Sequence, residues 1–247
     1  MIASLPMYDW PEVQPANDQL WASVRDRLRA TGLAAPETLS RDRRAHDWTA
    51  PDLLLSQTCG FPYRTALHGK VTLVGTPDYG LEGAPPGYYY SVLVVPADRG
   101  GDWQDFIDGT LAINGYDSQS GWAAPQNHAA GVGRRFGRIL VTGAHRDSAT
   151  AVADGEADIA AIDAMTWRLV EAYRPDVARR LRICARTTPT PGLPLITALR
   201  DHAGLLRTAF AETIAALAPE DRKSLHLQGV VQIPASAYLA VPTPPGM

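Results

Sequence analysis

The sequence predicts an α/β protein with two lobes, each built on a mainly parallel sheet with flanking helices. Short apolar and β-branched runs alternate with helix-like segments along most of the 247 residues, which is the pattern of parallel strand–helix–strand units. The composition is 45% hydrophobic and 20% charged, which is ordinary for a globular chain, and the length suffices for two cores. Two crossings between sheets, near residues 96 and 189, predict the two lobes.

In the first half of the chain, helical spacing is clearest over 17–31, where Leu20, Trp21, Val24 and Leu28 recur on one face and Gly32 follows. The remaining elements are read from short apolar runs. They are strands over 2–7, 52–56, 71–75, 88–96 and 111–114, and a short helix over 102–107.

In the second half, strand and helix continue to alternate. Gly121 opens a helix that runs to about Arg135, and Gly155 ends another. The expected strands cover 138–142, 159–163 and 181–186, and the helices 147–154 and 164–173, with a further turn starting at 175. After 197 the chain is helical, with another helical piece over 219–225, a short segment over 229–233 and an irregular proline-rich tail over 241–247.

The two crossings define the lobes. The run 92–96 is long enough to leave one sheet and enter another, and 187–194 contains three prolines that disfavour helix and stiffen a connector. We therefore expect lobe 1 to comprise 1–96 plus 189–247, and lobe 2 to be an insertion over 97–188. Ligands of open α/β sheets bind at the carboxyl ends of strands, and clefts between lobes are favoured sites.

Two motifs within the predicted insertion lie where a strand gives way to a helix. They are Asp117–Gly121 (DSQSG) and Thr142–Ser148 (TGAHRDS). A helix start leaves about four N–H donors unpaired and carries roughly half a positive charge, so it attracts anions. With their hydroxyl groups, the two motifs predict an oxyanion site that needs no lysine cluster.

Composition excludes several classes of protein. The net charge of −3, without a basic run carrying interleaved aromatics, argues against nucleic-acid binding. No apolar stretch approaches the roughly 20 residues of a membrane span, and two cysteines provide neither a disulfide framework nor a metal site. No cofactor is expected. Residues 1–6 lack the features of a secretory signal, so the sequence as written predicts a cytoplasmic protein, or a periplasmic one whose leader was removed.

The order of six segments resembles the phosphate/phosphonate substrate-binding proteins of ABC transporters, which have the type II periplasmic-binding-protein fold. The segments are Leu5–Asp9, Asp52–Gly60, Tyr90–Ser91, Asp117–Gly121, Thr142–Ser148 and Gly155–Asp163. The resemblance implies that Ser118, Gln119, Ser120 and His145 hold the oxyanion. It also implies that Tyr8 closes over the ligand and that Asp163 faces a polar or cationic part of it.

Each of these residues also has a structural interpretation. Ser118 and Ser120 could simply cap the helix that follows, His145 could cap a turn, and Ser148 could cap a helix or donate to the ligand. Asp163 could cap the helix that starts at residue 164.

The other candidates lie at strand ends. Gln57 and Thr58 follow a buried strand, which is more typical of a site than of a core, whereas Tyr8 and Tyr90 could serve as core or as ligand wall. No catalytic residue is expected.

The function predicted from these residues is non-catalytic binding of a small anion such as phosphate or a phosphonate in a cleft that closes by hinge bending, for ABC-type transport with a permease as partner. Two alternatives remain open. One is an enzyme on the same fold, either a lyase of the menaquinone-biosynthesis type or a hydrolase with Ser120, His145 and Asp163 as a triad, although no Gly-x-Ser-x-Gly motif is present. The other is a ligand-sensing subunit.

Overall fold

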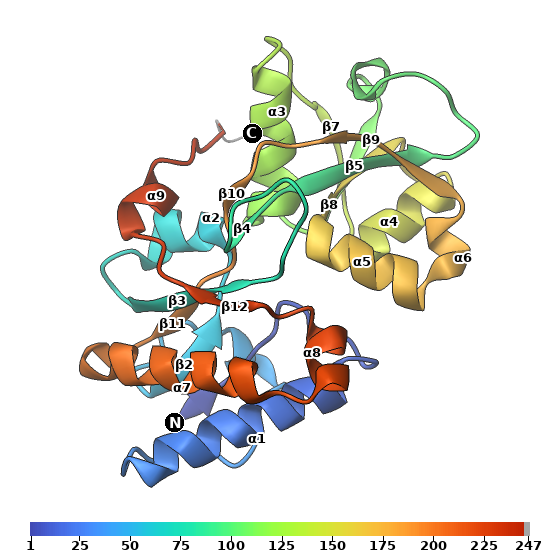
Figure 1. The fold of residues 1–247 in the computed structure, drawn as a ribbon. Coiled ribbons are helices and arrows are strands. Elements are labelled where there is room, and N and C mark those ends of the chain that lie inside the picture. The colour runs from blue at the N-terminus through green and yellow to red at the C-terminus, as the bar shows by residue number, and fades with distance from the viewer. Residues whose placement is uncertain (245–247) are drawn as a thin grey trace. The chain divides into compact units, whose positions relative to one another are not determined.

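The computed structural model describes residues 1–244 and divides the chain into two compact units (Figure 1). Unit 1 comprises Met1–Gly87 and Pro191–Leu239, and unit 2 comprises Tyr88–Thr190 and the chain from Ala240 on. The chain therefore passes between the units three times. The last three residues of the predicted irregular tail, 245–247, lie outside the described residues.

The first predicted lobe boundary moves from residue 96 to residue 87, the second moves only from 188 to 190, and a third crossing at residue 239 was not predicted. The expected lobe 1 ended at residue 96, but β5 (Ser91–Pro96) pairs with two strands of unit 2 and so belongs to that unit. The residues from Ala240 on were expected in lobe 1, yet they lie with unit 2, where Asn127 Nδ2 donates a 2.9 Å hydrogen bond to the carbonyl of Pro242. Strand pairing and the tail contact, which have no local sequence signal, decide the first boundary and the third crossing.

The sheet of unit 1 has the order β1-β2-β11-β3-β12. β1 and β2 are parallel, whereas β11 runs antiparallel to both of its neighbours and β12 is antiparallel to β3. The central strand β11 lies within a stretch for which the sequence predicted no strand. The bounds are β1 Ile2–Ala3, β2 Leu53–Gln57, β3 Thr72–Asp78, β11 Leu195–Thr197 and β12 Gly229–Val231.

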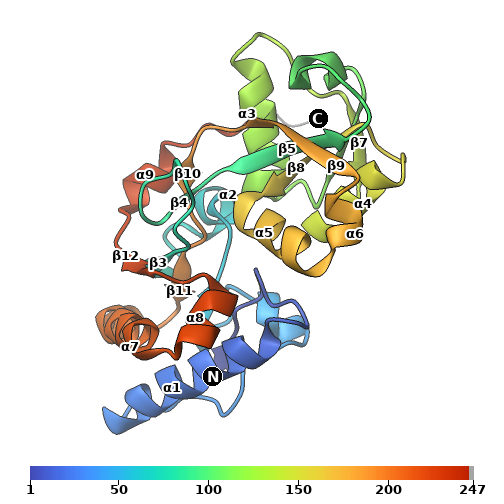
Figure 2. The ribbon, with the colours of Figure 1, turned by 45° about the vertical axis from the view of Figure 1, so that its right-hand side comes forward.

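Helix α1 (Gln14–Ala30) packs beside α7 (Ala203–Ala216) under this sheet (Figure 2). The four apolar residues whose spacing predicted α1 are almost fully buried, and Pro15 in the first turn suits a helix start. The shorter helical elements of unit 1 are η1 Arg43–His46, α2 Gly60–Pro62, η2 Tyr63–Leu67, η5 Arg200–His202, α8 Pro219–Leu225 and α9 Ala235–Leu239.

The sheet of unit 2 has the order β7-β6-β8-β5-β9. β6 is parallel to β7 and β8, while β5 is antiparallel to β8 and β9. Both sheets are thus mixed rather than mainly parallel, because the strand that enters each sheet after a crossing, β5 or β11, runs against its neighbours. The bounds are β6 Thr110–Ile113, β7 Arg138–Val141, β8 Ile159–Asp163 and β9 Leu181–Arg186, and two short strands, β4 Tyr88–Tyr89 and β10 Thr190–Pro191, pair separately.

Helices cover both faces of this second sheet, with α3 on one side and α4, α5 and α6 on the other (Figures 1 and 2). A π-helical turn η4 leads directly into α3, which ends at Ala130 rather than near Arg135, because glycines follow and Gly133 takes a φ of 69°. The bounds are η3 Trp103–Phe106, η4 Gln119–Ala123, α3 Ala124–Ala130, α4 His145–Ala153, α5 Ala164–Tyr173 and α6 Pro175–Ala178.

Candidate functional site

The candidate site of unit 2 lies at one edge of its sheet. The parallel strands β6, β7 and β8 all end there, and the antiparallel strand β5 begins there. The DSQSG segment follows β6, the TGAHRDS segment follows β7, and Asp163 is the last residue of β8. The sheet topology therefore places the two predicted oxyanion segments on neighbouring loops, as the sequence interpretation required.

The DSQSG segment, Asp117–Gly121, is called the serine loop below. Hydrogen bonds hold it in place and leave some of its donor groups available to a ligand. Ser118 caps η4, its Oγ accepting from the Gly121 N–H at 2.9 Å, so its hydroxyl hydrogen stays available to donate. Ser91 Oγ at the start of β5 donates to the carbonyl of Ser120 at 2.9 Å. Ser118, Gln119 and Ser120 are all buried. The loop is thus fixed before any ligand arrives, which favours binding.

His145 joins the two segments. Its Nε2 lies 2.7 Å from Ser120 Oγ, so the predicted partners from separate loops are in direct contact. Although the residue as a whole keeps some exposure, its Nδ1 is buried and makes no hydrogen bond of standard geometry. Burial lowers the pKa of His145 to about 4, an effect that the nearby Ala161 carbonyl partly offsets. The imidazole is therefore neutral at neutral pH and acts as a dipole rather than as a cation.

The tautomer of His145 decides what Ser120 can offer. With the proton on Nδ1, Nε2 accepts the Ser120 hydrogen and the hydroxyl has none left for a ligand. With the proton on Nε2, the imidazole donates to Ser120 Oγ, and the hydroxyl hydrogen is free to donate to an anion. Only the second form completes a set of donors for an oxyanion.

Asn114 is a residue of this site that sequence reasoning missed, since it was taken as the end of a strand. Its Oδ1 is buried and has no hydrogen-bond partner among the described residues. A Cβ added at Gly121 would overlap this Oδ1 and would lie 3.3 Å from Cε1 of His145. Asn114, Gly121 and His145 are therefore packed together, and the glycine makes room for both side chains. A glycine that follows two serines within a helical turn was the available signal.

The remaining candidates of unit 2 have structural partners. Asp163 is buried and its Oδ1 caps α5, accepting from the N–H groups of Met165 and Thr166 at 2.8 and 3.0 Å. Ser148 is fully buried, and its Oγ lies 2.7 Å from Thr142 Oγ1, which fixes the turn between β7 and α4. The bond to Thr142 uses part of the hydrogen-bonding capacity of the Ser148 hydroxyl, and its contact with a ligand stays a prediction.

Tyr90 is buried at the start of β5, and the guanidinium of Arg186 lies over its ring, 5.3 Å from the centroid. This contact places a cation beside the edge of the sheet at which the serine loop lies, because β9 ends at Arg186 and pairs with β5 there. The sequence had not singled out Arg186.

A hydrolytic triad is not assembled. In a Ser–His–Asp triad, a carboxylate must accept from the Nδ1–H of the histidine and hold its tautomer. Ser120 and His145 are in contact, but Nδ1 of His145 has no carboxylate partner, and Asp163 Oδ1 is occupied in capping α5. The geometry favours two hydrogen-bond donors aimed at a ligand over an activated nucleophile.

In unit 1, the predicted residues Gln57 and Thr58 lie at the end of β2, and Tyr8 lies in the segment after β1. β1, β2 and β3 end at the same edge of the sheet, because β1 is parallel to β2 and the antiparallel β11 pairs with both β2 and β3. The ring of Tyr8 packs edge-on against Tyr79 with centroids 5.0 Å apart, and Gln57 Nε2 donates to Tyr79 Oη at 3.1 Å. Tyr79, which the sequence analysis did not single out, connects Tyr8 with Gln57.

Thr58 completes this cluster. It is fully buried, its N–H donates to the carbonyl of Pro194 at 3.0 Å, and its Oγ1 has no hydrogen-bond partner among the described residues. Leaving a buried hydroxyl unpaired costs about 1–3 kcal/mol. Ligand contact by Thr58 stays a prediction, and the unpaired hydroxyl is the observation that bears on it.

Within residues 1–244, no group of three or more His, Cys, Asp or Glu side chains is arranged to hold a metal ion. In the same range no helix is both long and apolar enough to cross a membrane.

The sequence profile of the family described as "ABC transporter, phosphonate, periplasmic substrate-binding protein" matches residues 55–237. The chain belongs to this family. Its members bind a substrate and are not enzymes, so the function is non-catalytic binding of a small solute, and the alternative of a lyase or hydrolase is not favoured.

Solved structures share the fold at low sequence identity. PhnD1 from Prochlorococcus marinus in complex with methylphosphonate superposes with a TM-score of 0.73 at 12% identity, covering 96% of this chain and 94% of that one. A binding protein component of an ABC phosphonate transporter from Pseudomonas aeruginosa gives 0.69 at 17% identity, with 93% and 80% covered. XAC2383 from Xanthomonas citri bound to ATP gives 0.68 at 16% identity, with 96% and 92% covered.

No curated protein matches the sequence. The structural likenesses, all below one-fifth identity, establish the two-lobed α/β fold and leave the ligand to be argued from the residues.

Proposed function

We propose that this protein binds a small phosphonate through the serine loop and His145 of unit 2 and serves as the substrate-binding subunit of an ABC transporter. The observation that carries the proposal is the 2.7 Å contact between Ser120 Oγ and His145 Nε2 at the starts of two helices. A phosphonate head group offers three oxygen acceptors. Hydroxyl and first-turn N–H donors of the two loops match them, with the imidazole orienting the Ser120 hydroxyl toward the ligand.

Because His145 is uncharged, it cannot attract the ligand as a cation, and the anion must be recognised by hydrogen bonds. Two serine hydroxyls, one of them oriented by a neutral imidazole, bind an oxyanion by hydrogen bonds alone, as helix-end sites do. Arg186, stacked on Tyr90 at the same sheet edge, is the nearby cation that offsets the ligand charge. Such a site is selective for the geometry of its donors more than for charge.

We further propose that Tyr8, Gln57, Thr58, Tyr90 and Asp163 contact the ligand as well. The unpaired Oγ1 of Thr58 and the ring of Tyr8, fixed by Tyr79, support roles in binding polar and apolar parts of the ligand respectively. For Asp163, its place at the end of β8, beside the start of β5, supports contact with a polar part of the ligand.

Calorimetric titration of the purified protein with methylphosphonate tests the proposal. Inorganic phosphate and methanesulfonate serve as comparison ligands of similar size. Ser120→Ala and His145→Ala should each weaken methylphosphonate binding by about tenfold or more, the loss of one hydrogen bond to a charged group. Ser236→Ala, which removes an exposed hydroxyl on α9, is the matched control and should bind as the wild type does.

The proposal fails if none of the three anions binds, or if all three variants bind alike. Melting temperatures without ligand separate a lost contact from a damaged fold, because Ser120→Ala should lose ligand affinity with little change in the melting temperature.

The transport role has a separate test. The family description places its members in the periplasm as components of ABC transporters, and we propose the same compartment and a permease partner for this chain. Ligand-loaded protein should stimulate ATP hydrolysis by the reconstituted permease and ATPase of the transporter that it serves. No stimulation by the loaded protein would contradict the transport role and leave the binding site in place.

A further inference from the structure

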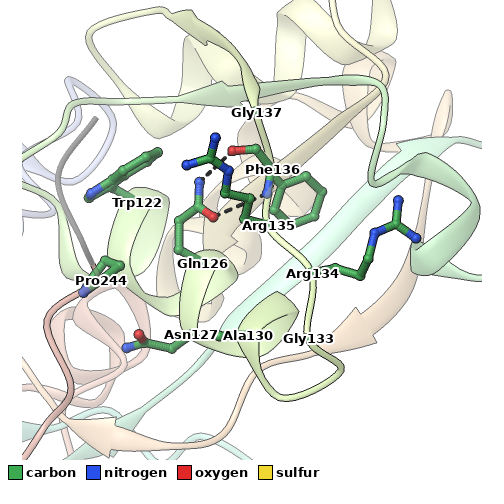
Figure 3. A pocket seen from close by; sticks show the side chains of 10 residues that line it. All are labelled: Trp122, Gln126, Asn127, Ala130, Gly133, Arg134, Arg135, Phe136, Gly137 and Pro244. Carbon is green, nitrogen blue, oxygen red and sulfur yellow. Dashed lines mark hydrogen bonds between the residues drawn. The ribbon is translucent and has the colours of Figure 1, made fainter.

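A hollow in unit 2 lies beside α3 and contains none of the residues of the proposed phosphonate site. It has a volume of about 700 Å³ and mainly apolar walls, within the usual range for small-molecule sites. Figure 3 shows the side chains that line it, which come from η4, α3, the loop after α3 and the tail at Pro244.

Two aromatic side chains form the walls. Trp122 is buried and packs edge-on against Tyr116, with centroids 5.0 Å apart. Phe136 is almost fully buried, and its ring lies against Trp103 with centroids 6.5 Å apart. Flat apolar walls that are fixed in this way suit the body of an aromatic or alicyclic ligand.

Two hydrogen bonds of Gln126 hold the loop after α3, which lines the hollow, in place. The buried amide of Gln126 donates from Nε2 to the Phe136 carbonyl at 2.9 Å and accepts at Oε1 from the Phe136 N–H at 3.2 Å (Figure 3). The side-chain amide of Gln126 thus pairs with both backbone groups of Phe136, as a neighbouring strand would. The residue next to Phe136 is therefore held in a fixed position.

That neighbour is Arg135. Its guanidinium makes no hydrogen bond or ion pair with any of residues 1–244, and in Figure 3 its side chain extends toward Gln126 and Trp122. Arg134, one residue earlier, points away from them and pairs with Asp108 at 2.7 Å. A single unpaired cation beside two aromatic walls is complementary to an anion with an apolar body.

We propose that this hollow is a second binding site, for a small organic anion with an aromatic or alicyclic body, whose acidic group pairs with Arg135 while Trp122 and Phe136 contact the body. Arginine suits a planar carboxylate because it can donate two parallel hydrogen bonds. The site is independent of the phosphonate site, because it uses none of the same residues.

Paired probes test the proposal: 2-naphthoate carries the anion, and 2-naphthamide is its neutral counterpart. The full chain should bind 2-naphthoate at least fivefold more tightly than 2-naphthamide in calorimetric titrations. Arg135→Gln should abolish that preference. Arg134→Gln is the matched control and should keep it, since Arg134 is turned toward Asp108.

The position of the probe is checked by NMR. Addition of 2-naphthoate should shift the indole N–H of Trp122 and the side-chain amide of Gln126, and Ser120→Ala should leave its affinity unchanged. Saturating methylphosphonate should not displace it. The proposal is overturned if neither probe binds at millimolar concentration, if Arg135→Gln and Arg134→Gln behave alike, or if methylphosphonate displaces the naphthoate.

Discussion

At the scale of single residues, the neutral state of His145 has a consequence for stability. Burial lowers its pKa to about 4 in the folded protein, against about 6.5 in an unfolded chain. Between these values the unfolded chain binds more protons, so stability is full above pH 6.5 and is lost as pH falls toward 4. At pH 5 the loss from this residue alone is about 2 kcal/mol.

His145→Gln should remove that loss, because glutamine does not titrate. We expect the wild type to lose about 2 kcal/mol more than the variant between pH 7 and pH 5, measured by urea unfolding at each pH. Parallel curves for the two proteins would show that His145 takes up its proton while folded, in conflict with a buried neutral ring.

Gly121 gives a second prediction at this scale. A Cβ here would overlap Oδ1 of Asn114 and crowd His145, so Gly121→Ala should displace one of these side chains. We expect methylphosphonate affinity to fall by tenfold or more, measured by calorimetry. Gly204→Ala is the control: no atom lies within 4 Å of its added Cβ, it sits in α7, and it should bind normally with equal or slightly greater stability. Equal affinities for the two variants would exclude Asn114 and Gly121 from the site.

At the scale of elements, Asp163 serves α5 and, in the proposed function, the ligand. Asparagine caps helices about as well as aspartate, so Asp163→Asn should keep the stability that Asp163→Ala loses, about 1 kcal/mol in urea unfolding. If Asp163 also faces a cationic part of the ligand, Asp163→Asn should weaken binding of 2-aminoethylphosphonate and leave methylphosphonate unaffected. Equal changes in affinity for the two ligands would show that Asp163 caps α5 and does not face the cationic part of the ligand.

How far the sequence predicts an element depends on where its signal lies. The bounds of β8, α5 and β9 agree with the sequence interpretation, because β8 and β9 are apolar runs and an aspartate caps α5. β11 was missed because three residues beside Pro194 show no period, and the strand exists only through pairing with β2 and β3. The predicted strand over 88–96 breaks into β4 and β5 at Tyr90.

The residues of the candidate site also fall into those that the sequence predicts and those that it does not. Ser120 and His145 were predictable from their motifs, since hydroxyl and imidazole groups at helix starts have a recognisable chemistry. Tyr79, Asn114 and Arg186 were not, because each matters only through a residue outside its own element: Gln57, Gly121 or Tyr90.

At the scale of the whole molecule, the two units differ in how the chain builds them. Unit 2 is nearly continuous, and its five-stranded sheet is complete within residues 88–190. Unit 1 needs two distant segments, because β11 from the second segment lies between β2 and β3 from the first. Removing a central strand leaves two edges unpaired and opens the core, whereas removing the tail from unit 2 takes no strand out of its sheet.

A fragment of residues 88–190 should therefore fold alone, and a fragment of residues 1–87 should not. We expect dispersed amide signals in the NMR spectrum of the first fragment and a collapsed spectrum for the second. Because the serine loop and His145 both lie within 88–190, the fragment should still bind methylphosphonate, more weakly than the full chain, and Ser120→Ala should abolish that binding. A fragment 88–190 that stays unfolded would mean that this unit depends on unit 1 for its stability, despite its complete sheet.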